Sequence, residues 1–178
     1  MKIVVLTGSP HRKGSTALLA ERFICGAEEA GHEVFRFDAA FGHVGPCLAC
    51  NHCRSEAGRC VQRDAMDGIY PRLLEADCVV FVSPIYYHGM AAQVKAVVDR
   101  FYGIDAQLRS RSRKAVLIAA AADTDARVFE SVQAEFEGNL RYLGWQEAGR
   151  VLALACVDRA AVERTDFPEQ AYQLGRGL

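Results

Sequence analysis

The sequence predicts an α/β fold in which helices cover both faces of a five-stranded parallel sheet. Three observations carry this prediction. Short apolar runs rich in β-branched residues alternate with segments of helical periodicity, no repeat or low-complexity tract interrupts them, and two runs end in loops rich in Gly, Pro and hydroxyl side chains. With 178 residues, the chain is long enough for one domain with a substantial core.

Strands are expected where short apolar runs occur, at 2–7, 33–37, 78–82, 114–120 and 151–156. Helices are expected where apolar residues recur at helical spacing, at 17–30, 66–74, 91–102, 128–140 and 169–178. We expect Asp64 to cap the second helix, and Gly31 and Gly144 to end the first and the fourth. Residues 39–64 show no periodicity, and an unstructured run of this length is usually functional.

Strands that alternate with helices form a parallel, doubly wound sheet. In the strand order 2-1-3-4-5, ligands bind beyond the carboxyl ends of strands 1 and 3, where the winding direction changes. The loops that follow residues 2–7 and 78–82 should therefore both have the character of ligand loops, and both do.

The loop at 8–16 is rich in Gly and hydroxyls and has three potentially cationic side chains. A helix begins after it, and the unpaired N–H groups and positive dipole end of a helix favour an anion, here a phosphate. Lys13 stands where a P-loop needs Gly, and Pro10 stands where the dinucleotide fingerprint needs Gly. A terminal monoester phosphate, such as that of FMN, remains. The alternative is an ordinary turn in which Ser15 or Thr16 caps the helix.

The loop at 83–90 reads Ser-Pro-Ile-Tyr-Tyr-His-Gly-Met. Pro84 restricts the backbone, and Gly89 permits a positive φ or a close approach. The flat rings and polar tips of Tyr86, Tyr87 and His88 suit a planar heterocycle. The alternative is a surface turn with aromatic residues packed on neighbouring loops, but the pairing with the first loop favours a ligand. A third wall is expected from the small residues at 119–124, where the last two residues alternatively cap the next helix.

These motifs resemble those of the NADPH-dependent FMN reductase family of flavodoxin-like proteins, which often carry Gly-Ser-Pro-Arg-x-x-Gly-Asn-Thr and Ser-Pro-x-Tyr. The resemblance covers nearly the whole chain and includes 8–10, Thr16, 83–86, Lys95 and 99–100. The charged residues of the third helix equally suit an ion network at the helix end.

The resemblance implies a flavodoxin-like three-layer fold and a single FMN-binding domain over 1–178, with a cysteine-rich loop at 42–64 inserted after the second strand. It implies FMN as the cofactor, with Ser9, Ser15 and Thr16 around its phosphate. The implied cofactor-binding residues are Ser9, His11, Arg12, Ser15, Thr16, Pro84, Ile85, Tyr86, Tyr87, His88 and Gly89.

The chain departs from the family pattern at two of these positions. His11 stands where Arg is frequent, and Ser15 stands where Asn is usual. Both keep hydrogen-bonding capacity, but His11 is only partly charged near neutral pH, a loss that Arg12 and Lys13 can offset.

Four of the seven cysteines, Cys47, Cys50, Cys53 and Cys60, crowd into one irregular segment. Thiolates at this spacing can converge on one metal centre, and four suffice for a [4Fe–4S] cluster. Zinc also accepts four thiolates, or His52 in place of one, and free thiols or a disulfide are the remaining alternatives. The spacing resembles the compact motif of the iron–sulfur flavoproteins, a branch of the same group.

Two turn residues of this segment and the three remaining cysteines of the chain are expected to be structural. Pro46 and Gly58 shape turns. Cys25, Cys78 and Cys156 fall in predicted helix or strand cores, where a free cysteine behaves as a small hydrophobic residue.

Composition narrows the function further. The formal net charge of −1 gives no reason to expect nucleic acid or an anionic membrane as a partner. The N-terminal apolar run is too short for a signal-peptide core, and no stretch approaches the length of a membrane span, so we expect a cytoplasmic protein without membrane contact.

The family resemblance implies an FMN-dependent oxidoreductase that passes electrons from NADH or NADPH to a quinone, another small acceptor or a cysteine-bound cluster. The hydride step in such an enzyme requires no catalytic acid or base, so no catalytic residue is expected. The family resemblance also implies a homodimer or homotetramer. The alternatives are a non-catalytic iron–sulfur flavoprotein that exchanges electrons with ferredoxin, and a thiol or metal sensor without flavin.

Overall fold

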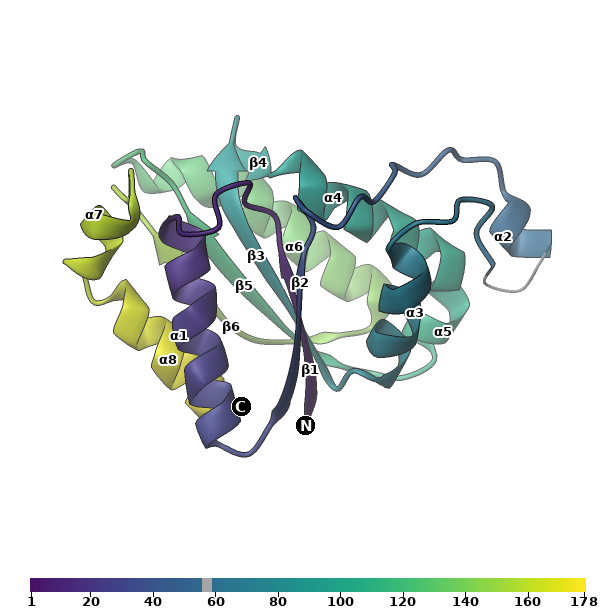
Figure 1. Ribbon diagram of the computed structural model, residues 1–178, viewed down its shortest axis with the longest axis horizontal. Coiled ribbons are helices and arrows are strands. Elements are labelled where there is room, and N and C mark those ends of the chain that lie inside the picture. Colours follow the sequence, from purple (N-terminus) through teal and green to yellow (C-terminus); the bar gives the residue numbers. More distant parts are fainter. Residues whose placement is uncertain (56–58) are drawn as a thin grey trace.

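The protein has three layers, a central sheet with helices on both faces (Figure 1). This computed structural model describes residues 1–55 and 59–178, so Gly58, expected to shape a turn, lies outside the described residues. The main strands are β1 (Lys2–Thr7), β2 (Glu33–Asp38), β3 (Cys78–Tyr86), β5 (Lys114–Ala120) and β6 (Gln146–Ala153). They pair in parallel in the order β2-β1-β3-β5-β6, which confirms the predicted strand order.

A short further strand, β4 (Gly89–Met90), pairs antiparallel with the end of β3. It arises because β3 continues past the predicted end at residue 82. Pro84 stays in the sheet, in parallel register with Ala120. The β3–β4 hairpin therefore rises at the carboxyl rim of the sheet (Figure 1).

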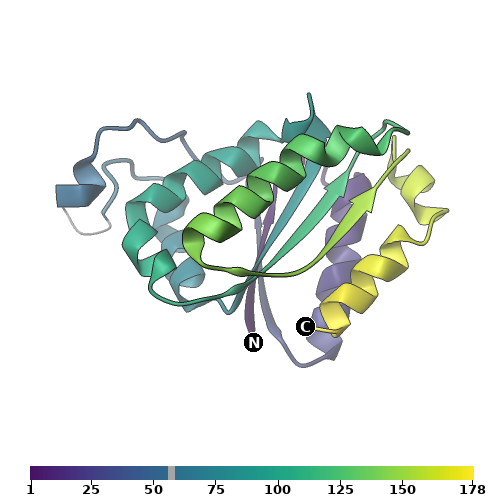
Figure 2. The same ribbon diagram turned by 180° about the vertical axis from the view of Figure 1, so that it is seen from behind.

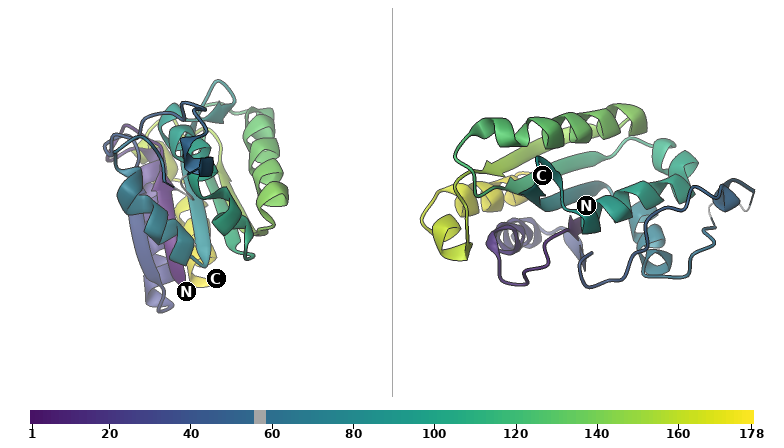
Figure 3. Two further views of the ribbon diagram at one scale, coloured as in Figure 1. Left: turned by 90° about the vertical axis from the view of Figure 1, so that its right-hand side faces the viewer. Right: turned by 90° about the horizontal axis from the view of Figure 1, so that it is seen from above.

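Two groups of helices cover the sheet, one on each face (Figures 1 and 2). One group consists of α1 (Ser15–Glu29), α7 (Arg159–Glu163) and α8 (Phe167–Arg176). The other consists of α3 (Met66–Glu75), α4 (Ala92–Asp99), α5 (Asp105–Arg109) and α6 (Glu130–Leu143). Short 3-10 helices at Arg100–Ile104 and Ala126–Phe129 precede α5 and α6. The helix α2 (His52–Ser55) lies in the cysteine-rich loop at 42–64, which is called the cysteine segment below. The described part of this segment projects from one end of the molecule (Figure 3).

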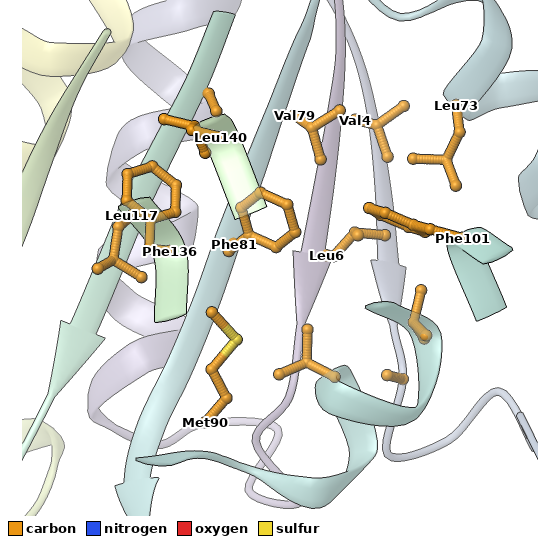
Figure 4. Packing of buried hydrophobic residues seen from close by; sticks show 14 of the residues in the cluster. Val4, Leu6, Leu73, Val79, Phe81, Met90, Phe101, Leu117, Phe136 and Leu140 are labelled. Carbon is orange, nitrogen blue, oxygen red and sulfur yellow. The ribbon is translucent and has the colours of Figure 1, made fainter. Parts of the chain in front are cut away.

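Each face of the sheet has its own apolar cluster, because successive strand residues point to opposite faces. In β1, Val4 faces α3 to α6, whereas Val5 faces α1 and α8. Figure 4 shows the first cluster, in which the Phe81 ring centroid lies 6.3 Å from that of Phe101 and 6.0 Å from that of Phe136. This packing fixes β3 relative to α6 and to the 3-10 helix that follows α4.

Helices α1 and α8 pack with their backbones in contact. A Cβ atom at Gly26 would lie 2.1 Å from the Tyr172 carbonyl oxygen, and one at Gly175 would lie 2.1 Å from the Phe23 carbonyl oxygen. Only glycine permits this approach on both helices. The contact holds the C-terminal helices beside α1, so that the chain leading into α7 reaches the rim at the start of α1 (Figure 1).

The strand β6 is displaced toward the N-terminus from the predicted position at 151–156. β6 is the edge strand of the sheet, and its first five residues are mostly polar or small, with Arg150 in ion pairs with Glu137 and Glu147, so no apolar run marks this part in the sequence. Gly144, at a φ of 69°, ends α6 in the left-handed conformation, as predicted.

Candidate functional site

The loops after β1 and β3 lie against each other at the carboxyl rim (Figure 1). The Gly8 N–H donates to the Val82 carbonyl oxygen at 2.9 Å. A Cβ atom at Gly8 would lie 2.8 Å from Val94 Cγ1 and 3.3 Å from Ala91 Cβ, so the loop leaves the sheet in close contact with the start of α4. Glycine is required here by the lack of space, which brings the first loop next to the second.

A cavity of about 790 Å³ opens at this rim, a volume within the usual range for small-molecule and cofactor sites. Four separate segments line it. Of the residues that the sequence predicts to bind the cofactor, the lining includes Ser9, His11, Arg12, Ser15, Thr16, Pro84, Ile85 and Tyr86. Tyr87, His88 and Gly89 are outside this lining and form the turn into β4.

The first turn of α1 is open to the cavity. Its N-cap is Gly14, and within the described residues no side chain caps it, so the predicted alternative of a Ser15 or Thr16 cap is wrong. The first N–H groups of a helix have no partner inside the helix and carry its positive dipole end. Because Gly14 to Thr16 line the cavity, these groups are available to an anion there.

The hydroxyls of the first loop have defined partners. Ser9 Oγ accepts a hydrogen bond from the His11 N–H at 3.1 Å, which folds the loop back on itself. Ser15 Oγ donates to the Cys156 carbonyl oxygen at 3.1 Å, which ties the start of α1 to the segment after β6. Thr16 is buried at the base of the cavity. These bonds hold the loop in a concave shape around the helix terminus.

Three cationic side chains and one histidine surround this terminus. His11, Arg12 and Lys13 come from the first loop, and Arg159 comes from α7. The Arg12 guanidinium lies 3.7 Å from the ring centroid of Phe41, a cation–π contact that fixes its position. Arg159 forms ion pairs with acidic side chains of α1 and α7. The cavity therefore combines a helix terminus with a basic loop, an arrangement that favours a phosphate.

The β3–β4 turn is strained. Tyr87 and His88 occupy its two central positions with φ values of 48° and 65°, which is the left-handed pair of a type I′ turn. The prediction that Gly89 takes a positive φ or permits a close approach is wrong, because Gly89 belongs to β4 and a Cβ atom there would lie 4.0 Å from the Tyr86 carbonyl oxygen. Two side chains in this conformation are uncommon and often occur at functional sites. Ser83, fully buried, holds the base of the hairpin by accepting from the Ala91 N–H at 2.8 Å.

The third wall contains Ala120 and Ala122, within the predicted segment. Neither Asp123 nor Thr124 caps the next helix, because Asp125 accepts the capping hydrogen bond from the Arg127 N–H at 3.0 Å. The cap lies nearer the helix than the sequence suggests.

The fourth wall, residues 156–160, is absent from the sequence prediction. Cys156 is buried, as expected, but it also lines the cavity. Asp158 then caps α7 by accepting from the Ala161 N–H at 2.8 Å. An Asp followed by a short run of good helix formers was the signal that could have revealed this helix start.

The four clustered cysteines line a second, much smaller cavity of about 20 Å³. Cys53 and Cys60 are half-buried, Cys47 and Cys50 are exposed, and all seven cysteines are free. Desolvation raises the pKa of the Cys53 thiol, and the other three thiols raise it further. The prediction that Cys25 lies in the core is wrong, because this residue is half-buried on α1 beside Glu29. The other two predicted core cysteines, Cys78 and Cys156, are buried.

The donor set of this small cavity fits a thiolate-bound metal centre, whereas its present volume fits about one water molecule. Among residues 1–55 and 59–178, no three His, Cys, Asp or Glu side chains are grouped so as to hold a metal ion as they stand. The exposed thiols would have to turn inward to ligate one.

Asp64 and Arg100 hold the cysteine segment to the body of the protein. Arg100 Nη1 donates to Asp64 Oδ2 at 2.7 Å and to the Gly45 carbonyl oxygen at 2.9 Å. Burial opposes ionisation of Asp64, but the hydrogen bonds from Arg100 and from the N–H groups of Gly45 and Met66 lower its pKa. Asp64 thus bonds the Met66 N–H at the start of α3, while Ala65 occupies the cap position.

The charged residues of the third predicted helix divide into two roles. Lys95 pairs with Asp99 one turn along α4, which is the helix-end ion network. Arg100 instead points to Asp64, and neither Lys95 nor Arg100 is among the residues lining the large cavity. The cysteine segment likewise projects from the end of the molecule opposite α7, away from that cavity (Figures 1 and 3).

A doubly wound parallel sheet with a basic, helix-terminated cavity at its switch point defines a flavodoxin-like α/β protein, a fold in which this edge of the sheet is the usual ligand site. The chain belongs to the NADPH-dependent FMN reductase family, whose family model matches residues 1–156. Of the residues that line the cavity, 157–160 lie beyond the matched region, as do the helices α7 and α8.

Named relatives share parts of the chain. An iron-sulfur flavoprotein of Methanocaldococcus jannaschii is 35% identical over 123 residues, which cover 68% of this chain and 63% of the relative. One of Methanosarcina thermophila is 39% identical over 104 residues, or 56% of this chain and 52% of the relative. The chain therefore spans about half to two thirds of the length of these curated relatives.

Solved structures show the same fold. An NAD(P)H:quinone oxidoreductase from Methanothermobacter marburgensis superposes with a TM-score of 0.77 at 22% identity, covering 98% of this chain and 94% of that one. Within the described part of the chain, no helix has both the length and the apolar character needed to cross a membrane.

Proposed function

We propose that the protein is an FMN-dependent oxidoreductase that takes electrons from NADH or NADPH and passes them to a quinone, another small acceptor or a cysteine-bound cluster. One observation carries the proposal: two loops from distant parts of the sequence close one cavity at the start of α1, in a chain of the FMN reductase family. Bound FMN would supply the hydride and electron chemistry, so the protein needs to bind, orient and shield it.

The first loop would hold the phosphate. The open first turn of α1 offers N–H donors, while Thr16 and Ser9 offer hydroxyls at the base of the cavity. Lys13 adds positive charge at its edge, and His11 adds a ring nitrogen that can donate a hydrogen bond. Ser15 contributes indirectly, because its bond to the Cys156 carbonyl oxygen keeps the helix terminus in place.

The ring would lie between the end of β3 and the third wall. Pro84 to Tyr86 present the edge of β3, and the small side chains of Ala120 and Ala122 leave space for a flat ring against the backbone. The exposed Tyr87 stands beside the opening, where a nicotinamide would enter. No acid or base is assigned, because hydride transfer requires none.

Cys47, Cys50, Cys53 and Cys60 would hold a [4Fe–4S] cluster. Support comes from the shared cavity of the four thiols and from relatives named as iron-sulfur flavoproteins. The same two observations favour a second candidate, a non-catalytic electron carrier that exchanges electrons with ferredoxin. Zinc in the same ligand set is the competing occupant.

We further propose one FMN-binding domain over 1–178 with the cysteine-rich loop at 42–64, a cytoplasmic location, and a homodimer or homotetramer. The projecting segment supports self-association, because it exposes two apolar side chains, Leu48 and Val61, that a second copy of the chain would cover. Size-exclusion chromatography with light scattering would report a mass of two or four chains, and a monomer would contradict this part of the proposal.

The decisive test is anaerobic purification followed by absorption spectroscopy, metal and sulfide analysis, and steady-state assays with NADH and NADPH. We expect a flavin spectrum and oxidation of one nucleotide coupled to quinone reduction. Negligible oxidation with intact flavin would favour the carrier, and failure of the apoprotein to take up FMN would overturn both candidates. Thr16→Val should lower FMN occupancy, whereas the matched control Thr165→Val, outside the cavity, should not.

A further inference from the structure

Arg100 is the most deeply buried charged residue near the cysteine segment. It is 2% exposed and lines the small cavity together with the four cysteines. Its Nη1 and Nη2 atoms bond Asp64, and Nη1 also bonds the Gly45 carbonyl oxygen. The charge of the guanidinium is therefore balanced, and the clamp on the segment is complete without the third nitrogen.

That third nitrogen, Nε, is buried and has no hydrogen-bond partner among the described residues. Buried donors without partners are rare in folded proteins, and each one calls for an acceptor. A guanidinium N–H points in a fixed direction, so Nε cannot turn to share the partners of the other two nitrogens.

The two hydroxyls nearest the cavity commit their protons elsewhere, and neither accepts from Arg100 Nε, which has no partner among the described residues. The Tyr70 hydroxyl donates to the Arg100 carbonyl oxygen at 3.1 Å, and the Tyr102 hydroxyl donates to Asn51 Oδ1 at 3.0 Å. The cavity thus joins four potential sulfur ligands to one buried, cationic donor without an acceptor.

We propose that Arg100 Nε–H donates a hydrogen bond to a sulfur atom of the group held by Cys47, Cys50, Cys53 and Cys60. This inference rests on the proposed four-cysteine ligand set. A hydrogen bond to a cluster sulfur stabilises the more negative, reduced state, so it raises the reduction potential. Arg100 therefore sets the potential of the bound group as well as holding the segment.

The test compares variants of the whole protein purified anaerobically. Arg100→Lys keeps the charge and can still reach Asp64, but it loses the planar Nε–H. Asp64→Asn weakens the clamp and keeps the Nε–H. Tyr102→Phe disturbs the same cavity wall and leaves both groups in place. Circular dichroism and thermal melting establish that each variant is folded.

The readouts are the midpoint potential of the cluster, and the magnetic coupling of an exchangeable proton to the reduced cluster after transfer to D2O. Arg100→Lys should shift the midpoint potential to a more negative value and lose one exchangeable-proton coupling. Asp64→Asn should shift the potential to a more positive value, since a negative charge is removed, and Tyr102→Phe should leave it unchanged.

Three results would overturn the inference. One is an unchanged potential in Arg100→Lys, and another is a shift of the same sign in Arg100→Lys and Asp64→Asn, as expected if Arg100 only holds the segment. The third is a set of exchangeable-proton couplings in Arg100→Lys that is the same as in the wild type. A wild-type protein without iron and sulfide would instead contradict the proposed ligand set itself, so the two failures are distinguishable.

Discussion

The substitution Gly8→Ala tests whether the first loop depends on direct contact with α4. The added Cβ would lie 2.8 Å from Val94 Cγ1 and 3.0 Å from Val94 Cβ, closer than real Cβ atoms approach. The neighbour is a β-branched side chain buried in the core, so it has one preferred rotamer and little room to move. Overpacking of this kind costs about 1–3 kcal/mol of unfolding free energy.

Urea denaturation measures this loss directly, and a melting point lower by about 2–4 °C per kcal/mol should accompany it. Gly68→Ala is the matched control, because a Cβ at Gly68 in α3 meets nothing within 4 Å. Alanine there should raise stability by about 0.5–1 kcal/mol through helix propensity. FMN uptake should fall in Gly8→Ala and stay unchanged in the control.

A double-mutant cycle with Val94→Ala isolates the contact. Val94→Ala alone leaves a cavity in the core, whereas the smaller side chain accommodates the Cβ added by Gly8→Ala. The loss of unfolding free energy in the double variant should therefore be about 1 kcal/mol smaller than the sum of the losses in the two single variants. A coupling of this size is usual for residues in contact. Additive losses would refute the claim that this contact positions the loop.

Three further changes follow from the geometry of the rim and the clamp. Tyr87→Asn combined with His88→Gly should stabilise the protein by about 1–2 kcal/mol in thermal melts, because both positions have a left-handed φ; no gain would contradict the strained turn. Ser15→Ala should cost about 1 kcal/mol by loss of one hydrogen bond, and an unchanged urea midpoint would speak against it. Asp64→Asn should cost about 3 kcal/mol near pH 7, because it leaves the Arg100 charge buried without a counter-charge. The lowered pKa of Asp64 means that its stabilisation is complete above the unfolded value of about 3.9 and is lost as the pH falls through the folded pKa. The variant should thus lose less stability than the wild type on acidification from pH 5 to pH 2, and parallel curves would contradict the pairing.

The sequence predicts the layers and strand order well because β1, β3 and β5 are buried apolar runs with few competing interpretations. The predicted position of β6 is wrong because this edge strand begins in a polar stretch, which is held by the ion pairs of Arg150 with two glutamates rather than by burial. The β4 hairpin fails because no Asn-Gly or Asp-Gly pair marks the turn; Tyr87 and His88 are held there by tertiary structure.

The site divides in the same way. Residues 8–16 and 84–86 are found from local motifs, since a glycine-rich strand–helix junction has a physical signature of its own. The fourth wall at 156–160 depends on α8 packing against α1 through Gly26 and Gly175, a long-range contact that no local pattern records. The partnership of Arg100 with Asp64 is invisible for the same reason.

The central claim is that the cavity at the start of α1 recognises the phosphate of a flavin mononucleotide. Calorimetric titration of the apoprotein with FMN and with riboflavin, which lacks only the phosphate, tests it most directly. Two charge-assisted hydrogen bonds contribute about 3 kcal/mol or more, equivalent to at least about a 100-fold difference in affinity. We predict one FMN per chain with riboflavin at least that much weaker; equal affinities, or no uptake of either ligand, would contradict the account.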